Sequence, residues 1–273
     1  MFFVGGAPRS GTTWLQHVLN AHPEISCEGE GLFMQQLATP IDRALAARNQ
    51  EIAGKNTNLF SHFGGYTLSP QTDADFLLGS GILLAFERQL AKKTVRVVGE
   101  KTPENVFLFP RLKTIFPHCK FIGIARDPRD VMTSSWHFFQ KTSINGDEEA
   151  TKLGFIKVAL PALKSGMRAI LDLPKQYPGA AMMLTYESMR AEPAKVAAQL
   201  YRFLGVSDAP EIVADCVART SFAALSGGRK AGEEKNGSFF RKGLTGTWQD
   251  TLSPEMNQLL LDETGPMFQE YGW

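Results

Sequence analysis

Residues 5–14, GGAPRSGTTW, combine turn-forming, cationic and hydroxyl-bearing residues in one short stretch. An apolar run precedes them and the amphipathic run TTWLQHVLNAH follows, which predicts a strand, a loop and the start of a helix. Free N–H groups at a helix start bind anions, and here Arg9 adds a cation while Ser10, Thr12 and Thr13 add hydroxyl donors. The alternative is an ordinary strand-to-helix turn whose polar residues are incidental. The pattern favours an anion-binding loop.

The glycines of this loop allow tight turning and close approach to a ligand. Their arrangement differs from the nucleoside-triphosphate loop G-x-x-x-x-G-K-[ST], because Thr12 rather than lysine follows Gly11. A nucleotide or small-molecule kinase on a similar sheet is therefore the second functional hypothesis. The missing lysine, and the lack of an evident magnesium-binding aspartate after an apolar strand, count against it.

A second candidate anion site follows the apolar run at residues 120–125. Arg126 directly follows that run, and Ser134 comes eight residues later on a predicted helix. If the chain turns back in between, a forked guanidinium contact and a hydroxyl reach one phosphate together. Arg126 paired with Asp127 or Asp130 in a turn-stabilising salt bridge is an equally weighted alternative.

A third candidate lies near the end of the chain, in the run FFRKGLTGTW. Its adjacent cations Arg241 and Lys242, followed by Gly243, are typical of a cradle made of backbone N–H groups and cationic side chains. The alternative is an exposed basic turn.

Together these stretches resemble the sulfotransferases that use 3′-phosphoadenosine 5′-phosphosulfate (PAPS). Further along, LTYESM at 184–189 looks like the family's Tyr-Glu-x-Met strand end, and RTSF at 219–222 looks like its Thr-Ser-Phe adenine contact. The run RKGLTGTW is similar to its C-terminal signature. Ordered matches over most of the chain make the resemblance specific, where each alone is weak.

The resemblance implies PAPS as donor, adenosine 3′,5′-bisphosphate (PAP) as product, and no metal. It implies three groups of nucleotide contacts. The adenine is contacted by Trp14, Tyr186, Thr220 and Phe222. The 3′-phosphate is held by Arg126, Ser134, Arg241, Lys242 and Gly243. The 5′-phosphosulfate is held by Arg9, Ser10, Gly11, Thr12 and Thr13. Without the resemblance, Trp14 is as well explained as a core residue of its helix.

The chain departs from the cytosolic pattern at two places that bear on catalysis. The familiar phosphosulfate lysine is Arg9 here, as in the protein-tyrosine and other Golgi-type branches. The Lys-Thr-His segment that supplies the cytosolic base is replaced by EKTP at 100–103, which keeps Lys101 as a sulfate contact and loses the histidine. Another group must therefore accept the acceptor's proton.

The segment NAHPEISCEGEGLF at 20–33 offers that group. It is similar to the corresponding stretch of the protein-tyrosine branch, and alignment from Arg9 places that branch's catalytic glutamate on Glu30, with Glu28 as rival. Two solvated loop carboxylates are the plain alternative. His137, one helical turn beyond Ser134, is an outside candidate.

The elements that must position these groups follow from apolar runs. Buried parallel strands are predicted at 2–6, 95–99, 120–125 and 181–186, and helices at 12–21, 131–139 and 193–203. Strand and helix alternation indicates an α/β protein, with ligands beyond the carboxyl ends of the strands. With the resemblance, we expect a P-loop-type three-layer α/β/α fold with a central parallel sheet, forming one domain over 1–273.

Composition narrows the class of protein. A formal charge of +1 argues against a nucleic-acid groove, and no apolar run is long enough to span a bilayer. Three widely spaced cysteines indicate neither a disulfide framework nor a zinc site. With no evident leader before the first motif, we expect a cytoplasmic enzyme. A binding module that has lost its base is a third hypothesis.

The acceptor is expected to be a small molecule with a hydroxyl, or less favourably an amine. Segments 31–94 and 140–178 are expected to cover the site. An apolar lining would favour phenols, lipids or polyketide-like alcohols. The candidate lining residues are Phe33, Phe60, Phe63, Phe76, Phe138, Phe139 and Phe155. The oligomeric state is left open.

Overall fold

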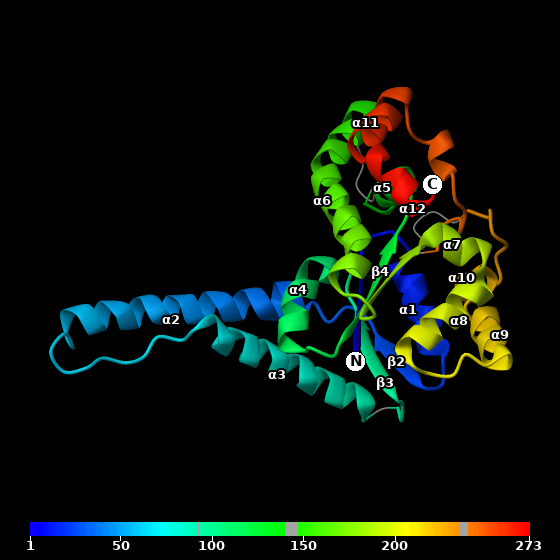
Figure 1. The fold of residues 1–273 in the computed structure, drawn as a ribbon. Helices are drawn as coiled ribbons and strands as arrows, with labels where there is room; N and C mark the ends of the chain where they lie inside the picture. The colour runs from blue at the N-terminus through cyan, green and yellow to red at the C-terminus, as the bar shows by residue number, and fades with distance from the viewer. Residues whose placement is uncertain (92, 140–146, 235–239) are drawn as a thin grey trace.

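A five-stranded parallel sheet lies at the centre of the molecule (Figure 1). The computed structural model describes residues 1–91, 93–139, 147–234 and 240–273, except the side chains of Met34 and Phe139. The strands run in the order β2-β3-β1-β4-β5, and neighbours pair in parallel. Their bounds are β1 Phe2–Gly6, β2 Ile25–Glu28, β3 Val97–Lys101, β4 Lys120–Ala125 and β5 Ala181–Thr185.

Four of these strands were predicted, and β3 begins and ends two residues later in the sequence than the predicted strand at 95–99. The prediction missed β2 because this edge strand has four residues and a polar Ser26 between Ile25 and Cys27. Ser26 is buried, and its hydroxyl accepts a hydrogen bond from Gln89 Nε2 at 3.0 Å. That partner comes from a distant helix, so no local pattern reveals the strand.

Helices cover both faces of the sheet, which confirms the predicted three-layer α/β/α fold. One apolar cluster joins Phe2 and Val4 to α1, α8 and α9, and the other joins Phe3 to α3, α4 and α6. This division follows from the alternation of side chains along β1. The helices are α1 Thr12–Ala21, α2 Thr39–Asn58, α3 Gln71–Leu90, α4 Asn105–Ile115, α5 Pro128–Phe139, α6 Glu148–Gln176, α7 Tyr186–Ala191, α8 Pro193–Leu204, α9 Pro210–Arg219, α10 Phe222–Ser226, α11 Pro254–Thr264 and α12 Phe268–Tyr271, with the short η1 Phe33–Ala38, η2 Thr247–Asp250 and η3 Gly265–Met267.

The strand order reverses direction at β1. After β1 the chain builds β2 and β3 on one side, then crosses over to β4 and β5 on the other. Such a switch point leaves a crevice beyond the carboxyl ends of the strands, where α/β proteins bind ligands. The loop that follows β1 is therefore placed at the crevice by topology.

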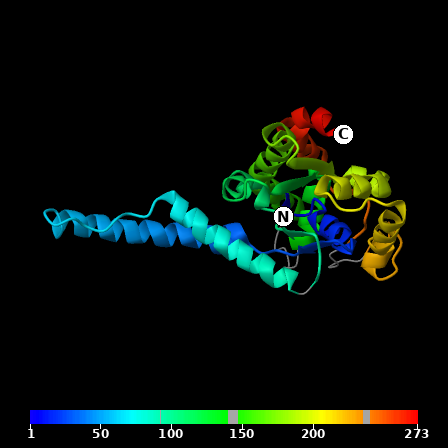
Figure 2. The same cartoon turned by 60° about the horizontal axis from the view of Figure 1, so that its bottom comes forward.

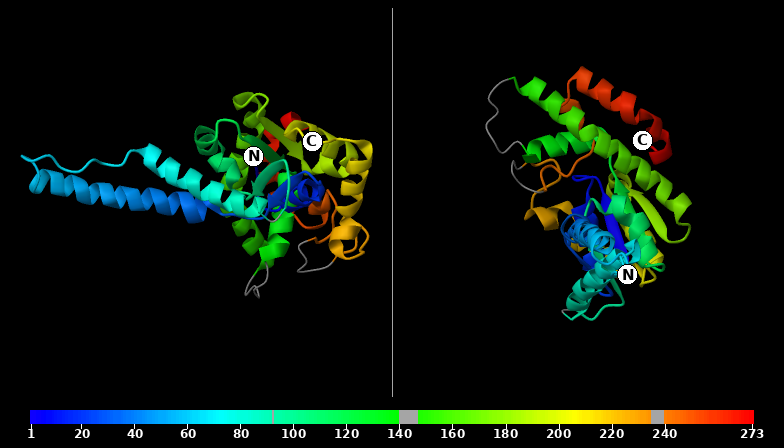
Figure 3. Two further views of the ribbon diagram at one scale, coloured as in Figure 1. Left: turned by 90° about the horizontal axis from the view of Figure 1, so that it is seen from below. Right: turned by 90° about the vertical axis from the view of Figure 1, so that its left-hand side faces the viewer.

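Segment 31–94 does not cover that crevice, so its predicted role was wrong. Its helix α2 and the returning residues 59–70, together called the arm below, project away from the body (Figures 1–3). No residue of α2 is buried. The arm is attached at its base by Arg111, which makes ion pairs of 2.7 Å with Asp42 and with Asp75.

Residues 140–146 of the second expected cover lie outside the described part of the chain. The helix α6 that follows them packs against β4 and β5, and its buried residues, such as Ile170 and Leu173, belong to the core. Within the described residues, no helix combines the length and apolarity needed to cross a bilayer.

Candidate active site

One cavity of about 330 Å³ lies beyond the carboxyl ends of β1 and β4. It is lined by the β1–α1 loop and α1, by Arg126 after β4, by Ser134 in the middle of α5, by helices α7 to α10 and by the loop at 240–247. All of the predicted nucleotide contacts except Ser10 line it, namely Arg9, Gly11, Thr12, Thr13, Trp14, Arg126, Ser134, Tyr186, Thr220, Phe222, Arg241, Lys242 and Gly243. None of the described residues of 31–94 or 147–178 lines it.

The β1–α1 loop is fixed by its own backbone. Ser10 is fully buried, and its hydroxyl donates to Ala7 O at 2.6 Å and to Ile124 O at 3.2 Å, so it ties the loop to β4. Gly11 has a φ of 98°, and a Cβ there would lie 2.6 Å from the Tyr186 ring. Only glycine meets both conditions without strain.

Arg9 is held in place from several directions. Its backbone has a φ of 70°, which is unusual outside glycine. Its Nε donates to Ser134 Oγ at 3.2 Å, and its guanidinium lies 4.5 Å from the ring centre of Phe138. Burial, followed by the charges of Arg126 and Arg241, lowers the pKa of Arg9 to about 10.

Arg126 is buried at the end of β4. Its guanidinium donates to Arg9 O at 3.3 Å and to Leu244 O at 3.0 Å, and lies 4.2 Å from the ring centre of Tyr186. Among the described residues its Nε has no hydrogen-bond partner. An unpartnered donor in a cationic cavity is an open position for an anion oxygen.

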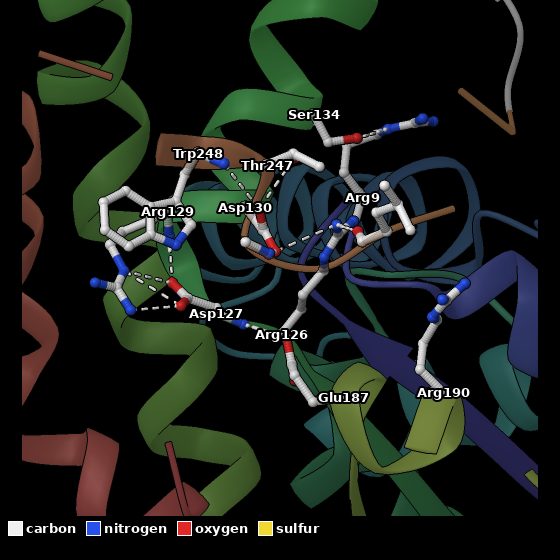
Figure 4. A network of polar contacts seen from close by, with 12 residues as sticks. Arg9, Arg126, Asp127, Arg129, Asp130, Ser134, Glu187, Arg190, Thr247 and Trp248 are labelled. Atoms are coloured by element: carbon white, nitrogen blue, oxygen red, sulfur yellow. Dashed lines mark hydrogen bonds and ion pairs between the residues drawn. The ribbon is translucent and has the colours of Figure 1, made fainter. Parts of the chain in front are cut away.

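Asp130 connects Arg126 to the loop near the end of the chain. It is 1% exposed and forms a 3.6 Å ion pair with Arg126. Its carboxylate also accepts from Gly246 N at 2.7 Å, Thr247 Oγ1 at 3.1 Å and Trp248 N at 3.2 Å (Figure 4). The salt bridge considered as an alternative for Arg126 therefore exists, and it does not remove Arg126 from the cavity.

Arg241 and Lys242 come from that loop. Both pair with Glu234, at 2.6 Å and 3.0 Å. Gly243 has a φ of 63°, and a Cβ there would collide with the Phe222 ring. Arg190, which the sequence reasoning missed, lines the same cavity and donates to Gly243 O. Its only sequence signal was a cation directly after the LTYESM motif, four residues beyond Tyr186.

Part of the cavity lining is apolar and aromatic. Trp14 Nε1 donates to Thr220 O at 2.9 Å, and the Trp14 and Tyr186 rings meet edge to face at 5.5 Å. The Thr220 hydroxyl donates to Cys216 O at 2.7 Å. Phe222 and Leu225 belong to this part of the lining, together with the apolar residues Val18, Val196, Ala197, Leu200 and Val217.

The candidate catalytic glutamates lie near the ends of β2 and β3. Glu28 is the last residue of β2 and pairs in register with Glu100. Glu30 follows on an exposed loop, where its carboxylate accepts from Lys101 Nζ at 2.7 Å. Lys101 itself is 3% exposed. The outside candidate His137 is half-buried on α5, and burial followed by Arg241 lowers its pKa.

Sequence reasoning missed the role of Glu100. This carboxylate is 3% exposed and accepts from Gly31 N at 2.8 Å, from Asn105 Nδ2 at 2.7 Å and from the Thr102 hydroxyl. Burial raises its pKa. Glu100 therefore anchors the backbone directly after Glu30, while the neighbouring Lys101 holds the Glu30 side chain. The EKTP run was its only sequence signal.

The model of the sulfotransferase family matches residues 2–210 of this sequence. This chain belongs to the sulfotransferase family. Cytosolic sulfotransferase 17 of Arabidopsis thaliana is 26% identical to it, over 93% of this chain and 70% of the plant protein. A putative protein-tyrosine sulfotransferase of Caenorhabditis briggsae is 24% identical, over 100% of this chain and 89% of that protein. The match favours sulfuryl transfer over the kinase hypothesis.

Solved sulfotransferases share the fold of this sulfotransferase. Mouse sulfotransferase SULT7A1 complexed with PAP superposes with a TM-score of 0.62 at 18% identity, over 97% of this chain and 83% of the mouse chain. The sulfotransferase domain from the curacin biosynthetic pathway gives 0.55 at 18% identity, over 97% of both chains. The expected P-loop-type α/β arrangement is thereby confirmed at the level of the fold.

Replacing Asp130 by Asn should destabilise this sulfotransferase, because three donors and Arg126 would lose their buried carboxylate. We expect the free energy of unfolding to fall by about 3 kcal/mol, within the range for breaking a buried charged network. Chemical denaturation followed by tryptophan fluorescence measures this. Asp250→Asn, at an exposed position nearby, is the control and should change stability by less than about 0.5 kcal/mol. Equal stability of the two variants would contradict the assignment.

Glu100 should give an unusual pH dependence of stability. Because burial raises its folded pKa, the folded protein retains a proton that the unfolded chain releases above its ordinary pKa of about 4.3. The free energy of unfolding contributed by this group therefore falls as pH rises from that value to the raised folded value. The melting temperature of the wild type, relative to Glu100→Gln, should decline across this window.

The exposed Glu255→Gln on α11 is the matched control. Its melting temperature should follow the wild type at every pH. A constant difference between the wild type and Glu100→Gln from pH 4 to pH 8 would contradict the assignment of a raised pKa to Glu100.

Proposed function

We propose that this sulfotransferase binds PAPS in the cavity and transfers its sulfuryl group to a hydroxyl of a small-molecule acceptor. One observation carries the proposal. Three cationic segments, far apart in the sequence, line one cavity together with aromatic and apolar side chains. PAPS has the matching form, an adenosine with two separate anionic groups.

The adenine would occupy the part of the cavity that is lined by Trp14 and Phe222, between these two rings. Aromatic faces and aliphatic side chains bind a nucleobase by stacking and burial. Because the Trp14 indole N–H is taken up by Thr220 O, the ring is fixed and its face is presented without a conformational cost. Tyr186 packs against Trp14 in an edge-to-face contact, and would contribute to adenine binding by fixing the Trp14 ring.

The 3′-phosphate would lie among Arg126, Ser134, Arg241, Lys242 and the backbone of Gly243. The Arg126 Nε that lacks a partner would find an acceptor there. A phosphate carries about −1.5 to −2 charges near neutral pH, so it would offset the mutual repulsion of the clustered cations. Arg190 would contribute indirectly, because it donates a hydrogen bond to Gly243 O and so holds the backbone at Gly243.

The 5′-phosphosulfate would lie against the start of α1. Arg9, Gly11, Thr12 and Thr13 line the cavity there, and they would offer backbone N–H groups, two hydroxyls and a guanidinium. This is an arrangement that stabilises negative charge developing on a leaving phosphate oxygen. Ser10 would contribute through its position in the loop, since its hydroxyl is already bonded to two carbonyls.

Transfer then requires a base on the acceptor side. The acceptor oxygen forms a bond to sulfur while the bond from sulfur to the bridging phosphate oxygen breaks, and its electron pair goes to PAP. The acceptor proton passes to the Glu30 carboxylate, with Glu28 as the nearest rival. Lys101 holds Glu30 at 2.7 Å and offers the sulfate oxygens a cation.

The acceptor remains a hydroxyl-bearing small molecule in this proposal. The apolar lining expected for it is not assembled, because Phe33 and Phe155 pack in or against the core while Phe60, Phe63 and Phe76 are exposed away from the cavity. Phe138 lies beside Arg9, and the side chain of Phe139 lies outside the described atoms. Independence of metals and a cytoplasmic location stay predictions.

Ligand-induced stabilisation tests the nucleotide assignment. PAP should raise the melting temperature in proportion to the logarithm of its concentration, whereas ATP with magnesium should not. Arg126→Ala should weaken PAP binding by about 10- to 100-fold, the value of charge-assisted hydrogen bonds to phosphate. Arg202→Ala, on the exposed face of α8, is the control. Stabilisation by ATP and not by PAP would overturn the proposal.

Single substitutions test the base. Glu30→Gln should lower kcat by about 100- to 10,000-fold, the usual contribution of a general base, with PAP affinity unchanged. Glu28→Gln should retain most of the activity. Transfer of labelled sulfate from PAPS to a panel of phenol, steroid, sugar and peptide acceptors supplies the assay. Undiminished turnover in both variants would remove the glutamates and leave His137 to be tested.

A further inference from the structure

The arm has a defined internal structure. Asn49 donates to Ser69 O at 2.7 Å and accepts from Ser69 N at 2.8 Å, and Asn56 makes the same pair of bonds to Tyr66, at 2.9 Å and 3.0 Å. The two asparagines are seven residues apart and so lie on one face of α2. They hold the returning segment along the helix, so the tip cannot fold back onto the body without breaking these bonds.

Apolar side chains near the end of the arm have no cover. The segment LFSHFGGYTLSP at 59–70 contains no Asp, Glu, Lys or Arg. Phe63 is 84% exposed and Tyr66 is 71% exposed. The patch, called the tip patch below, consists of Leu59, Phe60, Phe63, Tyr66 and Leu68. An uncharged, aromatic patch on a projecting element is typical of an interaction site.

Helix α3 carries a second uncovered patch. Its inner face buries Leu78, Ile82 and Phe86 against the body. On its outer side Phe76, Leu83 and Leu90 repeat every seven residues, flanked by Leu77 and Leu84, and all five are exposed. A seven-residue apolar repeat is the pattern of a helix that packs along another element. This set is called the α3 stripe below.

We propose that a second copy of this chain covers both patches, with the tip patch of each protomer on the α3 stripe of the other. A two-fold axis makes such a contact reciprocal, so one interface uses both patches of each chain and closes the assembly at two chains. The arm suits this use, since its 20-residue helix is about 30 Å long and reaches well beyond its own body (Figures 1 and 2).

The area available is that of a stable dimer. A half-exposed aromatic or leucine side chain offers about 100 Å² for burial. The ten residues of the two patches together offer about 1,000 Å² per protomer, against the roughly 800 Å² per partner of a standard interface. A patch of this size exposed on a monomer would favour aggregation.

Charge favours a protein partner over a membrane surface. Residues 39–90 contain five Asp or Glu and four Lys or Arg. Segments that bind anionic lipid are rich in Lys and Arg, and this one has no cationic excess. The tip patch and the α3 stripe also match each other, because both are aromatic and leucine-rich.

Sedimentation equilibrium on the full chain tests the proposal. The wild type should be a dimer at micromolar concentration. Leu59→Glu/Phe63→Glu, in the tip patch, and Leu83→Glu/Leu84→Glu, in the α3 stripe, should each weaken dimerisation by about 30-fold or more. Val158→Glu places the same charge at an apolar position on α6 that is 82% exposed, and should stay dimeric. Circular dichroism checks that each variant is folded.

Mixing the two double variants tests the reciprocal geometry. Each variant alone has both contacts damaged, but a mixed dimer contains one intact tip patch on one intact α3 stripe, so the mixture should associate more strongly than either variant. Failure of the mixture to associate, or dimers unaffected by both variants, would overturn the proposal. A monomeric wild type would also overturn it, and co-sedimentation of that monomer with phosphatidylcholine vesicles would assign the arm to lipid instead.

Discussion

The gathering of Arg9, Arg126 and Arg241 around one cavity is the constraint on which this end of the sulfotransferase depends. Burial is the main cause of the lowered pKa of Arg9, and the charges of Arg126 and Arg241 act in the same direction. Two carboxylates offset part of the charge, Asp130 beside Arg126 and Glu234 beside Arg241. They come from the protein's own scaffold, and the remaining positive field faces the cavity. An anionic ligand with two separated charged groups would complete the balance, and this is the physical reason for proposing PAPS as the donor.

The same interactions assemble the site from distant parts of the chain. Arg126 donates to carbonyls of the β1–α1 loop and of the C-terminal loop, while Asp130 receives the backbone N–H groups of the latter. These contacts require β1 beside β4, with Gly6 level with Ile124. The strand order supplies that neighbourhood at the point where the topology reverses. Glu187 adds a further tie, since it accepts from Asp127 N and from the indole of the C-terminal Trp273.

The sequence alone predicted the strands and site residues whose pattern lies within one short stretch of the chain. An apolar run followed by a loop that carries a cation identified β1, β4 and their loops, because strand, turn and anion contact lie within ten or so residues of each other. The sequence did not predict features that depend on hydrogen-bond partners from other parts of the chain. The strand β2 depends on Gln89, and Glu100 depends on Gly31 and Asn105. Phenylalanine content also could not separate the buried Phe33 from the exposed Phe63, so the cover assigned to segment 31–94 was wrong.

Backbone strain distinguishes the two sides of the proposed reaction from the rest of the fold. Among the described residues, the non-glycine positions with positive φ are Arg9, at 70°, and Leu32, at 51°. Each costs about 1 kcal/mol or more. Arg9 stands on the donor side, and Leu32 ends the loop of Glu30 on the acceptor side. Such conformations persist only where surrounding contacts fix them, and both have such contacts nearby, Ser10 for Arg9 and the Glu100 bond to Gly31 N for Leu32. In the proposed reaction these are the two places where in-line transfer would need groups held rigidly, and the buried Ser10 and Glu100 supply contacts that hold them.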